Sequence, residues 1–234
     1  VLTTTILTVG RGPVRRPRMT KAKAVLRGGV MHQDSTGRFP ITSLSGNEYI
    51  MVFYCEDSNY IHVEPYAFKA ASSHTAAFDR RFKFFTTRGR TPRIQRLDNE
   101  CSAQLLHHMQ QVCGQRVELV APEDYGPNKV KRAIQTWKDH FIAGLATVDP
   151  DFPIGLWDQC RQLEDVLNMM RGSHTHPHLT AYEELNAPID SGSIRLLPFG
   201  LKVCALNDPK SWGPYQQRCT TGFVINFPHN HHRS

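Results

Sequence analysis

The sequence predicts a mixed β-sheet flanked by helices, which is an α/β or α+β layer fold. Strand-like and helix-like apolar spacings alternate along the chain, and an antiparallel hairpin comes early among them. The 234 residues suffice for one full hydrophobic core. We therefore expect a core over residues 28–190, a basic and flexible arm over 1–27, and a small β-rich segment over 191–234.

The expected arm accounts for the whole net charge of +7. It holds seven basic residues and no acidic one, so the rest of the chain has 21 of the 28 basic residues against 21 acidic ones. Its prolines and like charges disfavour packing against a core. We expect Arg15, Arg16 and Arg18 to contact nucleic-acid phosphates; an anionic membrane surface and a solvated tail without a partner are the alternatives.

The first half of the expected core begins with a strand over 28–34 that ends in an aspartate. Two apolar segments, 48–56 and 59–68, are separated by turn-forming residues and predict an antiparallel hairpin. Alanine and phenylalanine at helical spacing predict a helix over 70–88, which a glycine and a proline stop. A short strand over 93–98 ends in a second aspartate.

The second half alternates again, with a helix over 102–112 and a strand over 115–122. The longest helix follows, because the apolar residues from Val130 to Val148 fall within about 80 degrees of one another on a helical wheel. The next helix, 154–170, is expected to face inward through Leu156, Trp157, Cys160, Leu163, Val166, Leu167 and Met170. The remaining expected elements are short: a helix over 179–186 and β segments over 201–206 and 222–226.

Cysteine spacing and hydropathy indicate the cellular context. The six cysteines are scattered without a C-x-x-C pair, and we expect reduced, mostly buried thiols of an intracellular protein. The opening VLTTTILTV is too short and too rich in threonine for a secretory leader. No apolar run approaches the roughly 20 residues that span a bilayer, so we expect no membrane partner. Trp137 and Trp157 lie on apolar stripes and are expected in the core.

Two aspartates, Asp34 and Asp98, each stand at the end of an expected strand. If these strands are neighbours, the two carboxylates meet at one edge of the sheet, where a divalent metal could bind. Mg²⁺ prefers oxygen ligands and takes one or two carboxylates together with substrate phosphate. Paired ions of this kind assist phosphoryl transfer. The alternative is that both aspartates only cap turns.

Four segments of the chain resemble the integrase core of copia-type long-terminal-repeat retrotransposons, in the family's order. They are QDSTGRFPITSLSGNEYIMVFYCEDSNYIHVEP (33–65), TPRIQRLDNECSAQL (91–105), KRAIQTWKDHFIAGLATVDPDFPIGLWD (131–158) and LNMMRGSHTHPHLTAYEELNAP (167–188), with a weaker match through SWGPYQQRCTTGFVINFP. The resemblance implies a ribonuclease-H-like five-stranded sheet in which two aspartates and a helical glutamate bind Mg²⁺ or Mn²⁺. The implied activity is 3′-end processing of DNA followed by strand transfer into a target phosphodiester.

Within this resemblance Asp34 matches the first aspartate, in the D-x-T-G-x-F-P context, and Asp98 matches the second, in R-L-D-N-E. Asp57 lies in the hairpin and is expected to be structural. The family's N-x-x-E-R-A-I motif is NKVKRAI here, so that Lys131 occupies the glutamate position. Because a protonated ammonium cannot ligate a metal, we expect weak or no activity unless another acid replaces the glutamate. The candidates are Glu100, Glu123 and Asp124.

Two functions from different classes follow. The first is a metal-dependent DNA strand-transferase, and the second is a non-catalytic nucleic-acid-binding remnant. In either, the basic residues of the long helix would contact DNA: Lys129, Lys131, Arg132 and Lys138. A functional integrase would be a homo-oligomer acting in the nucleus.

The other polar motifs are expected to carry no site. No G-x-x-x-x-G-K-[ST] pattern is present, so no nucleoside triphosphate site is expected. The histidines of SHTHPH (173–178) are expected in a loop, and those of the last six residues in a frayed tail.

Overall fold

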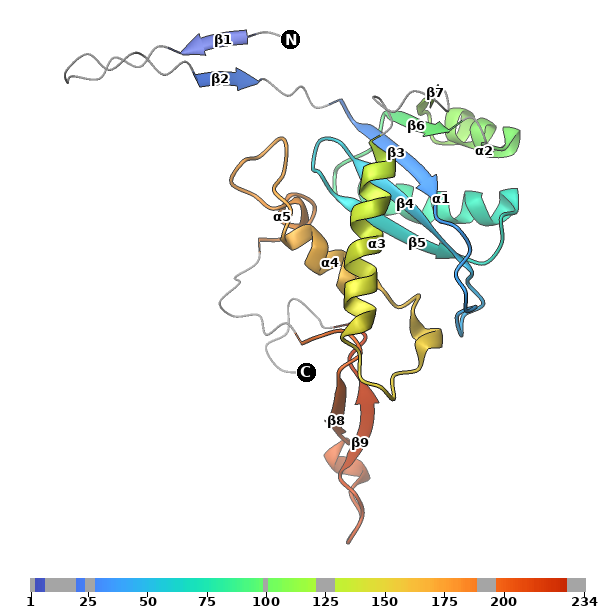
Figure 1. Ribbon diagram of the computed structural model, residues 1–234, viewed down its shortest axis with the longest axis vertical. Coiled ribbons are helices and arrows are strands. Elements are labelled where there is room, and N and C mark those ends of the chain that lie inside the picture. Colours follow the sequence, from blue (N-terminus) through green and yellow to red (C-terminus); the bar gives the residue numbers. More distant parts are fainter. Residues whose placement is uncertain are drawn as a thin grey trace, which may run out of the picture.

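The computed structural model describes residues 3–6, 20–23, 28–98, 101–120, 129–188 and 197–226. Its centre is a mixed five-stranded sheet in the order β5-β4-β3-β6-β7 (Figure 1). The strands are β3 (Val30–Ser35), β4 (Tyr49–Cys55), β5 (Ile61–Tyr66), β6 (Ile94–Asp98) and β7 (Arg116–Val120). β4 is antiparallel to both β3 and β5, whereas β6 is parallel to both β3 and β7. The expected mixed sheet and its hairpin are confirmed.

Helices cover both faces of this sheet (Figure 1). α1 (Ala71–Thr86) and α2 (Ala103–His107) pack on one face, and α3 (Val130–Ala146) and α4 (Arg161–Met169) pack on the other. Side chains alternate along β4, so that Val52 packs under α3 while Phe53 packs under α1. Because β4 is buried on both sides, its sequence is a continuous apolar run rather than an alternating one.

The expected helix over 102–112 changes type at its middle. The Ser102 hydroxyl accepts a hydrogen bond from the backbone N–H of Leu105 (3.2 Å) and so caps α2. After α2 the chain continues as a π-helical turn, η1 (His108–Val112). Gly114 then adopts a φ of 63°, a conformation that few other residues tolerate, and ends the element.

The expected helix over 154–170 is wrong over its first part. A single 3₁₀ turn, η2 (Ile154–Leu156), is followed by an irregular segment, and α4 begins only at Arg161. Met170 at the end of α4 is 66% exposed instead of facing inward.

Contacts with the loop after β3 explain this break. The Trp157 ring stacks on Phe39 at 4.2 Å between centroids, and its Nε1 donates to the Ile41 carbonyl (2.8 Å). The buried Asp158 carboxylate accepts hydrogen bonds from Ser43 and Asn47, each at 2.8 Å. These tertiary contacts override the local helix propensity. Trp157 and Trp137 are both buried, as expected.

The remaining elements are small. α5 (Ala181–Leu185) begins with a capping box between Thr180 and Glu183. A two-stranded sheet joins β8 (Lys202–Leu206) to β9 (Cys219–Phe223), with a 3₁₀ turn, η3 (Pro209–Ser211), between them. A second ladder pairs β1 (Thr3–Ile6) with β2 (Thr20–Lys23), which the sequence did not lead us to expect. The proposed division at residues 27 and 190 stays a prediction.

The expectation of mostly buried thiols is wrong. All six cysteines are free, but only Cys55 and Cys160 are buried, while Cys204 is exposed and the other three are partly buried. No helix in the described part of the chain has the length and apolar character needed to cross a bilayer.

Polar side chains of α4 cover the outer edge of β5. The Asn168 amide donates to the Ile61 carbonyl (2.8 Å) and accepts from the Ile61 N–H (2.9 Å). The Glu164 carboxylate accepts from the Val63 N–H (3.1 Å). An edge strand otherwise leaves such groups open to pairing with another chain.

Glu164 is also the centre of a buried charged cluster. Its carboxylate accepts from the Tyr60 hydroxyl and contacts His62 Nδ1, both at 2.9 Å, and Arg161 lies 3.6 Å away. Burial alone would raise the pKa of the Glu164 carboxyl, but the charges of His62 and Arg161 outweigh burial and lower it.

We expect Glu164→Ala to lower the free energy of unfolding by about 3–5 kcal/mol, because removing one partner of a buried pair leaves the other charge uncompensated. Urea unfolding followed by circular dichroism measures this loss. The control is Asp139→Asn, an exposed acid on α3 that contacts Gln135 of the same helix and is expected to change stability by less than about 0.5 kcal/mol. Equal small losses in both variants would contradict the role of Glu164.

Candidate metal site and nucleic-acid-binding helix

The two aspartates singled out in the sequence lie at the carboxyl ends of adjacent strands. β3 and β6 are paired in parallel up to His32 and Arg96, and the same register carried two residues further sets Asp34 beside Asp98. Neighbouring strands are about 4.8 Å apart. Both residues line one cavity of about 260 Å³. The structure therefore brings these two side chains together.

Both aspartates lie on the sheet face that α3 covers. Asp34 is directly opposite Val52 of β4, whose side chain packs under α3, and directly opposed residues share a face. Asp98 follows Arg96 by two residues, as Asp34 follows His32, and this spacing along a strand also keeps the same face. The two carboxylates thus share a face as well as an edge.

Other polar groups line the same cavity. Gln33 Oε1 and His74 Nε2 are buried and have no hydrogen-bond partner among the described residues. Lys69 also lines the cavity. Burial lowers the pKa of His74, and the charge of Lys69 lowers it further, so the imidazole is mostly neutral at pH 7. The cavity therefore offers a ligand an amide oxygen, an imidazole nitrogen and an ammonium group.

The donors around this cavity fit one hard cation. The two carboxylates are suitable ligands for Mg²⁺, whose other positions go to water and substrate phosphate. A second ion would need a further acid. In the family resemblance, the position of that acid is occupied here by Lys131 of α3.

The first turn of α3 carries cations, as the sequence predicts. Lys129 stands at the N-cap without a capping hydrogen bond from its side chain, and the turn contains no acidic residue. Lys129 Nζ pairs instead with Glu56 Oε1 at 3.2 Å. Lys131, Arg132 and Lys138 are exposed. α3 therefore presents exposed positive charge, part of which Glu56 neutralises.

Glu56 connects the start of α3 to the sheet, and sequence reasoning missed it. Its carboxylate contacts His32 Nε2 at 2.6 Å and Arg96 Nη1 at 3.3 Å. Burial alone would raise the pKa of Glu56, but its hydrogen bonds with His32 and Lys129 lower the pKa to about 2. Arg96 also pairs with Glu118 of β7 at 2.9 Å. These contacts link β3, β6, β7 and α3.

Asp57 is structural, as expected, because its carboxylate accepts from the backbone N–H groups of Gly28 (3.3 Å) and Gly29 (3.0 Å) just before β3. The histidines of 173–178 lie in a loop, as expected. Several predicted residues lie outside the described residues: Arg15, Arg16, Arg18, Glu100, Glu123, Asp124, His229, His231 and His232.

Comparison with solved structures identifies the fold. A chain from the simian T-cell lymphotropic virus intasome, determined in complex with PP2A regulatory subunit B56 gamma, matches 94% of this chain and 74% of its own length with a TM-score of 0.54 and 14% identity. The HTLV-2 integrase catalytic core domain with magnesium, in a trimeric form, matches 70% of this chain and 100% of its own length with a TM-score of 0.50 and 13% identity. The chain thus has the fold of retroviral integrase catalytic cores. No family model and no curated protein matches it.

We expect Glu56→Gln to destabilise the protein most near neutral pH. The carboxyl has a folded-state pKa below its ordinary value of about 4.5, so its contribution is present above that value and is lost as the pH falls toward about 2. Urea unfolding of both proteins across this pH range measures the difference. A difference that stayed constant from pH 7 to pH 2 would contradict a charge effect, and Asp139→Asn serves as the exposed control.

Proposed function

We propose that this chain is an integrase-like core that binds DNA and catalyses 3′-end processing and strand transfer weakly, in the manner of copia-type retrotransposon integrases. The observation that carries the proposal is the cavity that Asp34 and Asp98 share at the carboxyl edge of β3 and β6. Fold likeness to a chain of a viral intasome supports the same class of protein.

Asp34 and Asp98 would hold Mg²⁺ or Mn²⁺, and the HTLV-2 core of similar fold is described in complex with magnesium. When bound, such an ion activates an attacking hydroxyl and stabilises a leaving oxygen in phosphoryl transfer. Lys69, which lines the same cavity, would contact a phosphate oxygen of the DNA. His74, neutral at pH 7, would hydrogen-bond water or substrate there.

Lys131 is the reason to expect weak turnover. Two unit charges 4 Å apart interact by roughly 4 kcal/mol at an effective dielectric constant of about 20, and a divalent ion against an ammonium would be repelled by about twice as much. The lysine therefore disfavours an ion beside it as well as failing to ligate one. A single ion held by the two aspartates is what this site would retain.

Exposed cations would bind the DNA backbone. Arg132 and Lys138 of α3 are exposed, as is Lys131, and the arginines Arg15, Arg16 and Arg18 would add to them. Lys129 would contribute less, because it pairs with Glu56. Phosphate contacts of this kind give affinity without sequence preference.

The second candidate function is a non-catalytic nucleic-acid-binding remnant of a retroelement polyprotein, and the observation that favours it is Lys131 itself. Both candidates share the fold and the DNA-binding surface, and they differ in turnover. A functional integrase would act on chromosomal DNA in the nucleus and as a homo-oligomer; the HTLV-2 core is described in a trimeric form.

The test is a strand-transfer assay with Mn²⁺ and a labelled duplex end. We expect weak product from the native chain and at least about tenfold more from Lys131→Glu. Removing the repulsion by the lysine needs to lower the activation free energy by only about 1.4 kcal/mol to give that gain. Asp98→Asn is expected to abolish product in both backgrounds. The control Lys138→Glu reverses a charge farther along α3 and is expected to give no gain. Native activity that survives Asp98→Asn would overturn the metal assignment, whereas turnover that appears only in Lys131→Glu would favour the remnant.

The logarithm of the DNA affinity is expected to fall linearly with the logarithm of the salt concentration. In filter-binding measurements, Arg132→Ala and Lys138→Ala should each reduce the magnitude of this salt slope by about 1, because each variant loses one phosphate contact. Lys83→Ala, an exposed lysine of α1 on the opposite face of the sheet, is the matched control and should leave the slope unchanged. If the affinity of the native chain did not change with salt concentration, the proposed phosphate contacts would be wrong.

A further inference from the structure

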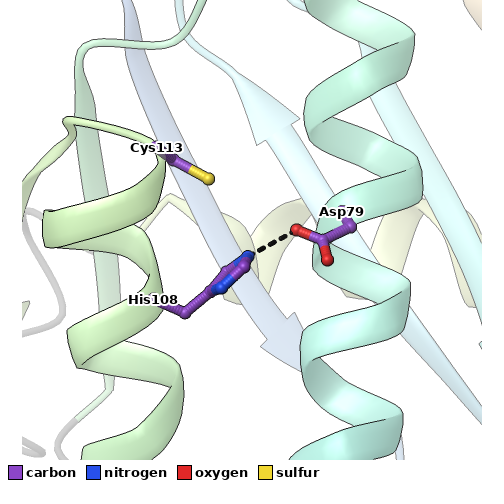
Figure 2. A group of neighbouring side chains, drawn as sticks. All are labelled: Asp79, His108 and Cys113. Carbon is purple, nitrogen blue, oxygen red and sulfur yellow. Dashed lines mark hydrogen bonds and ion pairs between the residues drawn. The ribbon is translucent and has the colours of Figure 1, made fainter.

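Three side chains of different chemistry meet where α1 lies beside the helical segment that follows β6. Asp79 belongs to α1, His108 begins the π-helical turn η1, and Cys113 follows that turn. One ligand atom of each lies within 4.8 Å of the other two, and His108 Nε2 contacts Asp79 Oδ1 at 2.6 Å. Figure 2 shows the Cys113 sulfur directed toward the same space. A carboxylate, an imidazole and a thiol therefore converge on one point.

The π-helical turn is what brings His108 and Cys113 to one side. The Cys113 N–H donates to the His108 carbonyl (3.2 Å), a hydrogen bond that spans five residues instead of four. In an α-helix, residues five apart diverge by about 140 degrees around the axis. The wider turn sets the two side chains one above the other. Single π turns inside helices are rare and recur at functional sites.

A buried arginine, Arg81 of α1, lies near the cluster. The Arg81 guanidinium is fully buried between the rings of Phe53 and Phe78, and two of its nitrogens, Nε and Nη1, have no hydrogen-bond partner among the described residues. Burial and the charge of Asp79 raise the pKa of the Cys113 thiol, and the charge of Arg81 offsets only part of this rise.

We propose that Asp79, His108 and Cys113 form a zinc site. Zn²⁺ accepts oxygen, nitrogen and sulfur ligands at about 2.0–2.3 Å in a tetrahedral arrangement. The sulfur ligand selects Zn²⁺ over Mg²⁺, which prefers oxygen ligands. On binding, the Cys113 thiol releases its proton, and a water molecule fills the fourth position. Two ligand atoms on one tetrahedral zinc ion are about 3.3 Å apart. The present 2.6 Å distance between His108 Nε2 and Asp79 Oδ1 would therefore lengthen by less than about 1 Å on zinc binding.

The zinc site would join α1 to the helical segment that follows β6. Asp79 comes from the first of these elements, and His108 and Cys113 come from the second. The Asp79 side chain is 51% exposed and that of His108 is 22% exposed, so an ion can reach them from solvent. The site is separate from the cavity of Asp34 and Asp98 and takes a different class of metal.

Cobalt substitution tests the proposal on the full chain. Added Co²⁺ is expected to produce a thiolate-to-cobalt charge-transfer band at one equivalent, and Zn²⁺ is expected to displace it. Cys113→Ser should lose the band, and His108→Ala should weaken binding by at least about tenfold. Cys101→Ser and His107→Ala, which alter a neighbouring thiol and a neighbouring imidazole, are the matched controls and should retain native binding.

A second measurement keeps the proposal testable if a variant fails to fold. In the native chain, Zn²⁺ is expected to slow alkylation of Cys113 at least about tenfold while leaving Cys204, the exposed cysteine, unchanged, as read by mass spectrometry. Histidines elsewhere can bind metal, but they give no thiolate band. A native chain without the band, a band that survives Cys113→Ser, or alkylation of Cys113 at the same rate with and without Zn²⁺ would overturn the zinc site.

Discussion

The parallel pairing of β3 with β6 is the constraint on which the candidate site depends. A slip of one residue would turn either aspartate to the opposite face, because side chains alternate along a strand. The register is fixed where the two strands begin, since the Gly29 carbonyl accepts from the N–H groups of Arg93 (2.9 Å) and Ile94 (3.1 Å). Gly29 has a φ of 60°, and an added Cβ would meet Arg93 at 3.2 Å, so this approach requires glycine. The carboxylate of Asp57, which lies in the hairpin between β4 and β5, accepts a hydrogen bond from the Gly29 N–H.

Two charged clusters attach helices to the central sheet. Glu56 connects the start of α3 to β3 and β6, and Glu164 connects α4 to β5. Buried ion pairs add little net stability compared with apolar packing, but breaking one is costly. Their role here is therefore positional. They set where α3 begins and how α4 lies along the sheet, while the apolar side chains around Trp137 supply most of the burial.

Local patterns were sufficient for most of the fold but for less of the site. Short segments bounded by turn-forming residues predicted the five central strands, and helical spacing of apolar residues predicted α3. The break before α4 was missed, since it depends on contacts of Trp157 and Asp158 with a loop far away in the chain. Asp34 and Asp98 were found from their places at strand ends. Gln33 and His74 were not, because neither shows in a sequence pattern that it lines their cavity. The cluster of Asp79, His108 and Cys113 depends on a π turn, which has no simple sequence signature.

Side chains of α4 cover one border of the sheet, at β5, and β7 forms the other border among the described strands. Among the described strands, β7 is paired on one side only, and its Leu119 is 50% exposed. Copies that polymerise by strand addition would therefore extend this sheet in a single direction, through β7. The joining strand would then stand two places from β6, the strand that holds Asp98.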